Sequence, residues 1–327
     1  MTNEKEEKNG QPVQCLTNSP VFGVGLALLG ALIITPDTLL IRLSGLEGWP
    51  LTAWRGLLIG GSMLVGWIVT TGRQIEADLK QITKVPFLLI MVAAAGNSLC
   101  FNFAAVETSI IVVLTALATV PILAALLSFI ILREVTTRRT WQAIMITMVG
   151  VLIVIFNGDG AVAAPTGNVF LGGFLGFMTA FCIAVVFVIT RRYPHTPVLL
   201  AVSLGTLSSG LIGFLETDLD EMMNGSLWAI LVMCLLVMPL ALSLISLAPR
   251  YTSPTNVSLL MLLEMVLGPF WVWLGTGERP SPIMLFGAAI VLVTLASYII
   301  ATARVEANLR HNKSVSEDSN PRHPDKL

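Results

Sequence analysis

The residue best suited to chemistry is Glu264, a carboxyl in the middle of the apolar run 254–274. Placing an ionisable side chain at the centre of a membrane helix costs roughly 2.5–3.5 kcal/mol, so its presence suggests a function. Burial favours the neutral form of a carboxyl. Two roles stay open: Glu264 loads and releases a proton or faces a cationic solute, or it remains protonated and hydrogen-bonded to a neighbouring helix.

Asp37 and Arg55 form a second candidate pair, of opposite charge, in the first two apolar runs. Asp37 follows Pro36, and a proline removes a backbone donor and tends to kink a helix. The kink places Asp37 and Thr38 beside freed carbonyls, which suits a cavity wall. We expect Arg55 to pair with Asp37 across the short hairpin, with Arg42 as the alternative partner. The pair either ties two helices together or serves as a gate or solute contact.

Asn97 and Asn256 add amide groups to the third and ninth apolar runs. An amide in a span makes an interhelical hydrogen bond worth about 0.6 kcal/mol on average, so a packing role and a solute-binding role both stay open. The candidate substrate-binding or coupling residues are therefore Glu264, Asp37, Arg55, Asn97, Thr38 and Asn256.

The remaining chemistry-bearing residues argue against an enzyme. The three histidines, His195, His311 and His323, lie outside the apolar runs and leave little material for a metal site or imidazole catalysis. We find no GxSxG nucleophile elbow, and no GxxxxGK[ST] loop, so ATP hydrolysis by this chain is excluded as a driver. The four cysteines show no disulfide or zinc spacing. We therefore predict no catalytic residue, metal or cofactor.

The elements that position these residues follow from composition. Of 327 residues, 55% are hydrophobic and only 12% are charged, against about 25% charged in soluble domains. The net charge of −1 gives no indication of nucleic-acid binding. Ten apolar runs are long enough, or nearly so, to cross a bilayer as helices. These runs are 21–41, 52–70, 85–105, 109–132, 141–156, 169–190, 198–215, 227–248, 254–274 and 282–302.

Lysine and arginine placement predicts the orientation. If the N-terminus is cytoplasmic, alternate loops and tails hold 16 of the basic residues on that side and 3 on the other, as the positive-inside rule requires. Both termini are then cytoplasmic, and the short loops suit a cell inner membrane. The predicted division is a tail over 1–19, one helical unit over 20–157, a second over 168–303, and a disordered cytoplasmic tail over 304–327.

An internal repeat relates the two units. A shift of 144 residues aligns Thr108–Ser109 with Thr252–Ser253 and Glu134 with Glu278. Because each half holds five spans, the halves enter the membrane in opposite orientations. Inverted repeats are typical of secondary transporters, in which the solute site lies at the repeat interface near the midplane. We expect Glu134 and Glu278 to cap helices and close loops.

Segments 104–150 and 248–294 resemble the closing part of the repeat in the EamA family of the drug/metabolite transporter superfamily. The stretch "TAWRGLL" around Arg55 is also similar to the second helix of that family. The matching positions are Pro121, Glu134, Glu264, Glu278 and Gly287, whereas Met265 replaces a usual proline and Ala143 replaces the glycine matching Gly287. The resemblance implies an all-α fold of two inverted five-helix repeats, and it implies that the helix holding Asn97 lines a central cavity.

The predicted function is secondary active transport of a small organic solute or metabolite by alternating access, with proton-coupled export as the preferred mechanism. A channel or a membrane receptor without coupled transport is the alternative. The expected partners are the solute, protons and the lipid bilayer, with no nucleic acid, and the chain acts as a monomer or homodimer. The residues do not indicate which solute is carried.

Overall fold

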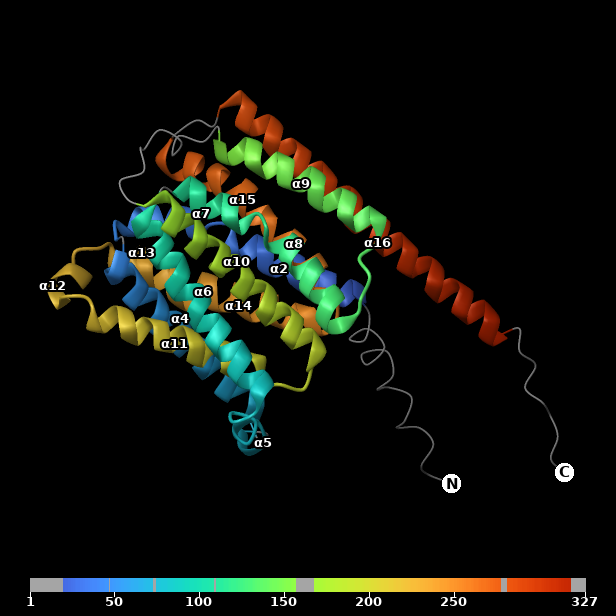
Figure 1. Cartoon of the computed structure of the whole chain (residues 1–327), viewed down its shortest axis with the longest axis horizontal. Coiled ribbons are helices and arrows are strands. Elements are labelled where there is room, and N and C mark those ends of the chain that lie inside the picture. The colour runs from blue at the N-terminus through green and yellow to red at the C-terminus, as the bar shows by residue number, and fades with distance from the viewer. Residues whose placement is uncertain are drawn as a thin grey trace, which may run out of the picture.

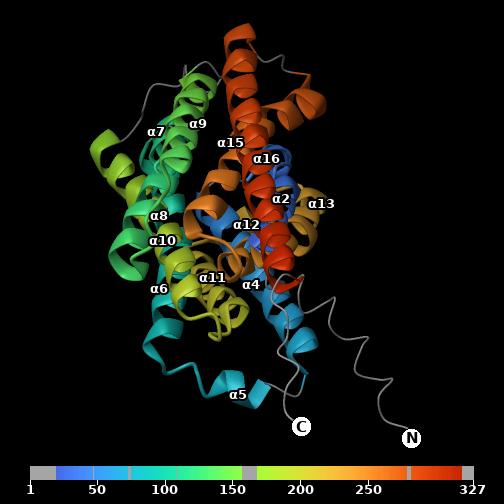
Figure 2. The same ribbon diagram turned by 90° about the vertical axis from the view of Figure 1, so that its right-hand side faces the viewer.

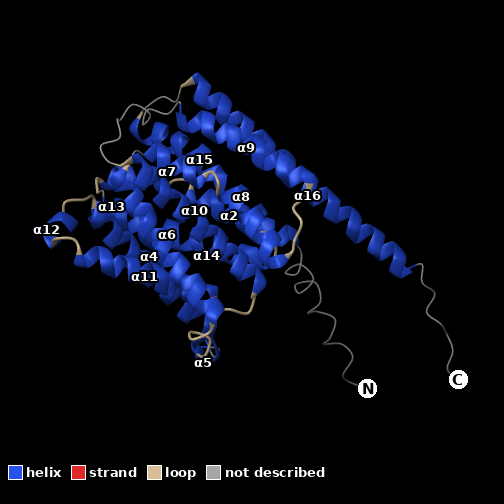
Figure 3. Cartoon of the chain, viewed as in Figure 1, coloured by secondary structure: helices blue, strands red, loops and turns tan. Residues whose placement is uncertain are grey.

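The computed structural model describes residues 20–46, 48–72, 75–108, 110–156, 168–277 and 281–318. The predicted tail over 1–19, Glu278 and the last nine residues lie outside this described part. All regular elements within it are helices, and no strand occurs there (Figure 3). Ten helical segments of the described chain are long and apolar enough to span a membrane, which confirms the ten predicted spans.

Seven spans are single helices. They are α4 (Gly48–Thr71), α6 (Val85–Glu107), α9 (Arg138–Phe156), α10 (Val169–Arg192), α11 (Val198–Leu215), α15 (Pro254–Thr276) and α16 (Pro282–Asp318). Two short helices lie outside the spans, α5 (Ile75–Leu79) and α12 (Leu219–Met222). The last span continues past the membrane segment as helix to Asp318.

The other three spans are broken near a proline, which cannot donate a helical hydrogen bond and clashes with the preceding turn. The first consists of α2 (Pro20–Ile34) and α3 (Asp37–Ser44), interrupted at Pro36 as predicted. The fourth consists of α7 (Ile110–Leu117), α8 (Val120–Leu127) and the π-helical η2 (Ser128–Leu132). The eighth consists of α13 (Leu227–Leu231), the π-helical η4 (Val232–Val237), α14 (Met238–Leu247) and the 3₁₀ turn η5 (Ala248–Arg250).

Helix packing follows a two-fold pattern. The first span packs on the eighth and ninth through α2, and the sixth span packs on the third and fourth through α10. Spans two and seven pack on each other, as do spans five and ten, which are α9 and α16. Each contact therefore has a counterpart after exchange of the two halves. Figure 1 shows α9 and α16 side by side along one edge of the bundle, and Figure 2 shows α16 along its length.

Glycines set the closest helix crossings, because small residues let membrane helices approach one another. Gly56 of α4 lies against Gly210 of α11, so that a Cβ on either residue would collide with the backbone of the other helix. Gly150 of α9 and Gly287 of α16 also meet: a Cβ on Gly287 would lie 2.8 Å from the Gly150 carbonyl oxygen, and a Cβ on Gly150 would collide with the Val291 side chain. Large apolar side chains such as Val69 and Phe286 are exposed on the outside, where hydrocarbon replaces water as the solvent.

Gly56→Ala is predicted to destabilise the bundle, because its methyl group meets backbone that has no room to move. The expected cost is about 1–3 kcal/mol, measured as a lower melting temperature of the purified protein in detergent. Gly61→Ala is the matched control on α4, since a Cβ there has no neighbour within 4 Å. It should melt at or slightly above the wild-type temperature. Equal melting of the two variants would contradict the crossing described here.

Candidate functional site

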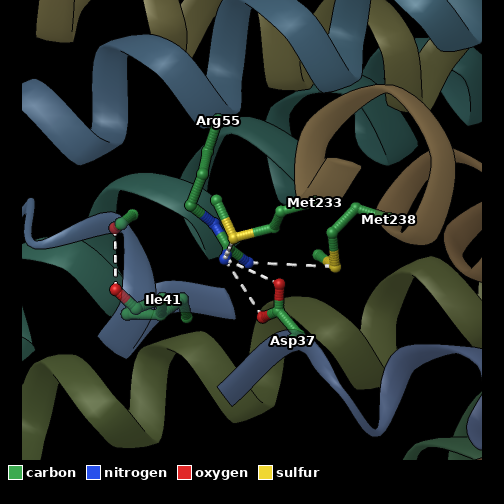
Figure 4. Close-up of polar contacts among 6 residues, drawn as sticks. Asp37, Ile41, Arg55, Met233 and Met238 are labelled. Atoms are coloured by element: carbon green, nitrogen blue, oxygen red, sulfur yellow. Dashed lines mark hydrogen bonds and ion pairs between the residues drawn. The ribbon is translucent and has the colours of Figure 1, made fainter. Parts of the chain in front are cut away.

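The buried ion pair between Asp37 and Arg55 lies at the break in the first span. Pro36 ends the first helical segment, and Asp37 occupies the first turn of α3. The Nη1 of Arg55 donates to both carboxylate oxygens of Asp37 at 3.0 Å (Figure 4). The Asp37 side chain is only 6% exposed and the Arg55 side chain only 16%. The structure thus contains the pair predicted from sequence, with Arg55 rather than Arg42 as the partner.

Two methionine sulfur atoms also contact the Arg55 guanidinium. Met233 Sδ lies 3.4 Å from Nη1 and Met238 Sδ lies 3.9 Å from Nη2 (Figure 4). Thioether sulfur is a weak acceptor, whereas guanidinium has five N–H donors. A carbonyl or carboxylate oxygen would therefore be a better partner for these donors than the sulfur atoms. This contact could not be predicted from the sequence, since methionine in an apolar run is typical of a hydrophobic core.

Glu264 faces the same region from the opposite repeat. It lies on α15, lines a cavity together with Asp37 and Arg55, and interacts electrostatically with both. Its side chain is half-buried, and this exposure belongs to the cavity. In the part of the chain that the structure describes, no hydrogen bond or ion pair engages its carboxyl group. The cavity therefore brings Glu264 together with the Asp37–Arg55 pair, the two charged features predicted from the sequence.

The central cavity measures about 230 Å³ and lies between the two repeats. Four spans of each repeat line it. Among the ten spans of the described chain, the two that contribute no residue are α9 and α16. Most of its wall is apolar, as is usual for small-molecule sites, with a few converging polar groups. The polar lining residues are Asp37, Arg55, Asn97, Ser98, Asn102, Thr179, Thr206, Ser246, Ser258 and Glu264.

Asn97 and Asn102 both line this cavity although five residues separate them. Residues four apart lie on one face of a helix, so Asn97 aligns with Phe101, and Ser98 aligns with Asn102. The two adjacent rows give α6 a broad face toward the cavity. Ser98 also accepts a hydrogen bond from the Ser209 hydroxyl at 2.9 Å, which ties α6 to α11.

Thr38 and Asn256, also candidates from sequence, lie outside the central cavity. Thr38 is exposed and adjoins Gly268 of α15. Asn256 lies near the start of α15, where its side chain donates to Thr252 Oγ1 at 3.0 Å and accepts from the Tyr298 hydroxyl at 2.6 Å. Position along the sequence placed both residues in spans, but it did not fix the direction of their side chains.

Trp271 connects α15 to the break in the first span. Its indole Nε1 donates to Thr35 Oγ1 at 2.8 Å, and the Thr35 hydroxyl donates in turn to the carbonyl of Leu32. The side chain is 40% exposed, as expected of an interfacial tryptophan. The hydrogen bond adds a structural role that the position of Trp271 near a span end did not indicate.

The ends of three spans are joined on the face of the bundle that carries Lys80, Lys84 and Arg250, here called the basic face. The Glu134 carboxylate accepts from Arg191 Nε at 3.3 Å. Arg191 Nη1 also donates to the Arg250 carbonyl at 3.1 Å, and Arg250 Nη2 donates to the Thr196 carbonyl at 2.7 Å. Glu134 thus connects the end of the fourth span to the end of the sixth, and its repeat partner Glu278 lies outside the described residues.

Ten membrane-spanning helices in two repeats, with a central cavity between them, define the architecture of a polytopic membrane transporter. The EamA-like transporter family model matches residues 21–156 and 170–300, one repeat each. The chain therefore belongs to the EamA-like transporter family, and it is a membrane protein that transports a solute.

Two further comparisons agree with this assignment. The chain is 27% identical over 258 residues to the "Uncharacterized transporter YdfC" of Bacillus subtilis (strain 168), covering 76% of this chain and 82% of that protein. A solved crystal structure has the same fold, with a TM-score of 0.72 and 16% identity. That match covers 88% of this chain and 99% of the solved chain.

Arg55→Met is predicted to destabilise the protein by about 3–5 kcal/mol, because it leaves the Asp37 carboxylate buried without a counter-charge. The double variant Asp37→Leu/Arg55→Met should recover most of that loss, since replacing a whole buried pair by apolar groups is often neutral. Melting temperatures of the purified proteins measure both effects.

Lys84→Met is the control for this series, because it removes an exposed positive charge far from the pair. Its free energy of unfolding should lie within about 0.5 kcal/mol of the wild-type value. If Arg55→Met melts like this control, Asp37 is not held in the buried pair described above.

Proposed function

We propose that this protein exports a small organic solute in exchange for protons, by alternating access around the central cavity. The observation that carries the proposal is the convergence of three ionisable groups, Asp37, Arg55 and Glu264, in one cavity between the repeats. Ionisable groups in membrane spans are costly and mark solute or ion pathways.

Alternating access is supported by how the cavity is built. Its walls come from four spans of each repeat, so a rocking motion of one half against the other would open it first to one side and then to the other. The volume of about 230 Å³ is below the roughly 300–1,000 Å³ of sites for drug-sized ligands. This size favours a small solute.

Proton coupling is supported by the difference between the two carboxyl groups. Arg55 supplies a full counter-charge to Asp37, whereas the Glu264 carboxyl has no hydrogen-bonded or ion-pair partner among the described residues. An ionised Glu264 would need a cation nearby, which either a proton or a positively charged group of the solute can provide. Competition between the two at one carboxyl is the physical basis of exchange.

Solute binding in this proposal falls to Arg55 and Asn97, which offer N–H donors, and to Asp37, which offers an acceptor. The Nη2 donor of Arg55, which contacts Met238 sulfur, is available to an oxygen of the solute at little cost, whereas Nη1 is held by Asp37. Phe101 and Phe187 in the same wall supply apolar contact area. The arrangement suits a solute that has polar groups at one end and an apolar body.

Glu264→Gln is predicted to abolish transport driven by a pH gradient. A thermal-shift screen against metabolites first identifies a solute that stabilises the wild type. Proteoliposomes are then loaded with this solute, and its efflux is measured with and without an inward proton gradient. We expect the gradient to stimulate efflux at least tenfold in the wild type and not at all in the variant. The glutamine side chain keeps the shape of glutamate but cannot carry its charge.

Glu76→Gln provides the matched control, because it makes the same change at an exposed carboxyl on α5. It should keep the full gradient stimulation. Gradient-driven efflux that persists unchanged in Glu264→Gln would overturn the role of this residue as proton carrier. Flux without saturation or counterflow in the wild type would favour a channel instead.

Both chain termini are predicted to be cytoplasmic, with the basic face of the bundle toward the cytoplasm. Green fluorescent protein fused to either end should fluoresce in bacterial cells, and alkaline phosphatase fused there should be inactive. A phosphatase fusion ending at Asn224, beyond the acidic segment that connects α11 to α13, is the control and should be active. Opposite results at the two ends would refute the even number of spans.

A further inference from the structure

A second cavity, of about 650 Å³, lies on the basic face and shares no residue with the central cavity. Its walls come from the first residue of η2, the connection to α9, the first turn of α9, the end of α10, the turn before α15 with the start of that helix, and the part of α16 around Tyr298. None of the transport steps proposed above uses this cavity, which we call the basic-face cavity.

The charge of the basic-face cavity is positive. Arg138, Arg139 and Arg191 line it, together with one carboxylate, Glu134. Arg191 and Glu134 neutralise each other at 3.3 Å. Arg138 and Arg139 are exposed and have no ion pair in the described part of the chain. They also begin α9, and a helix of this length carries partial positive charge at its N-terminus.

An unpartnered hydroxyl lies in the wall of this cavity. Ser128 is 2% exposed, lines the cavity, and its Oγ has no hydrogen-bond partner among the described residues. A buried polar group without a partner is costly, and such groups in native proteins call for an explanation. An oxygen of a ligand in the cavity would supply the missing partner.

The neighbouring polar wall is already held in place. Tyr298 donates to Asn256 at 2.6 Å, and its hydroxyl is 3.2 Å from Thr140 Oγ1. Thr137 Oγ1 in turn accepts from the backbone of Thr140 at the start of α9. These bonds connect α9, α15 and α16, so this part of the cavity wall is held in place by contacts within the protein.

The outer surface beside the cavity is lipid-facing. On α9, Met145 and Ile146 are exposed, and on α16 Val293 and Ile300 are exposed. A ligand with a charged group in the cavity and apolar chains along α9 and α16 would satisfy both surfaces. Basic pockets between membrane helices on the cytoplasmic side bind anionic lipid headgroups in this way.

We propose that the basic-face cavity is a binding site for the phosphate headgroup of an anionic phospholipid. Arg138 and Arg139 neutralise the phosphate, and Ser128 donates to one of its oxygens. Such a lipid would tie the η2–α9 connection to α16 and thereby brace the end of the bundle. Free inorganic phosphate offers the same oxygens without acyl chains, so the test includes it as a separate arm.

The test measures the melting temperature of the full-length protein in neutral detergent micelles that contain increasing mole fractions of phosphatidylglycerol. Phosphatidylcholine is titrated in parallel, and inorganic phosphate is added to phosphatidylcholine micelles. We expect saturable stabilisation by phosphatidylglycerol alone. Arg138→Gln/Arg139→Gln should raise the half-saturating mole fraction about twenty-five-fold, from roughly fivefold for each arginine.

Lys80→Gln/Lys84→Gln is the matched control, because it removes two exposed charges from the same face outside the cavity. It should leave the half-saturating fraction unchanged. If the arginine variant does not fold, Ser128→Ala provides the test, with an expected weakening of about fivefold from one lost hydrogen bond. Equal loss in the lysine control, no stabilisation by phosphatidylglycerol, or equal stabilisation by inorganic phosphate would each overturn the proposal.

Discussion

Hydrocarbon offers no partner for a charge, and this constraint determines where the ionisable residues of the protein lie. Asp37 and Arg55 are buried against each other at 3.0 Å, and Glu264 turns toward the same cavity. The outer surface is left to apolar side chains. The cavity therefore brings together an ion pair of the first repeat and a carboxyl of the second, away from the hydrocarbon.

The two repeats share a fold but not their chemistry. The shift of 144 residues that relates them pairs Glu264 with Val120, and both residues line the cavity. Val120 also begins a new helical segment before Pro121, whereas α15 runs unbroken through Glu264 and Met265, the residue that replaces proline in the second repeat. One half thus contributes a break at this depth and the other contributes a carboxyl.

The ten spans could be predicted from the sequence, because the length of an apolar run and the basic residues beside it are local signals. The Asp37–Arg55 pair was predictable since a short hairpin joins their spans. The sulfur contacts were not, because Met233 and Met238 lie some 180 residues away from Arg55 and look like core. The surroundings of Asn256 were not predictable for a related reason: the sequence indicates its depth in the span, but not that Tyr298 on α16 holds it away from the central cavity.

The hydrogen bond between Trp271 and Thr35 links the two halves of the site mechanically. Trp271 follows Glu264 by two helical turns on the same side of α15, and Thr35 directly precedes the proline break that orients Asp37. A shift or rotation of α15 when its carboxyl changes occupancy would pull on the hinge of the first span. Proton or solute binding at Glu264 would then change the orientation of Asp37, transmitted by α15 and by the one hydrogen bond between Trp271 and Thr35.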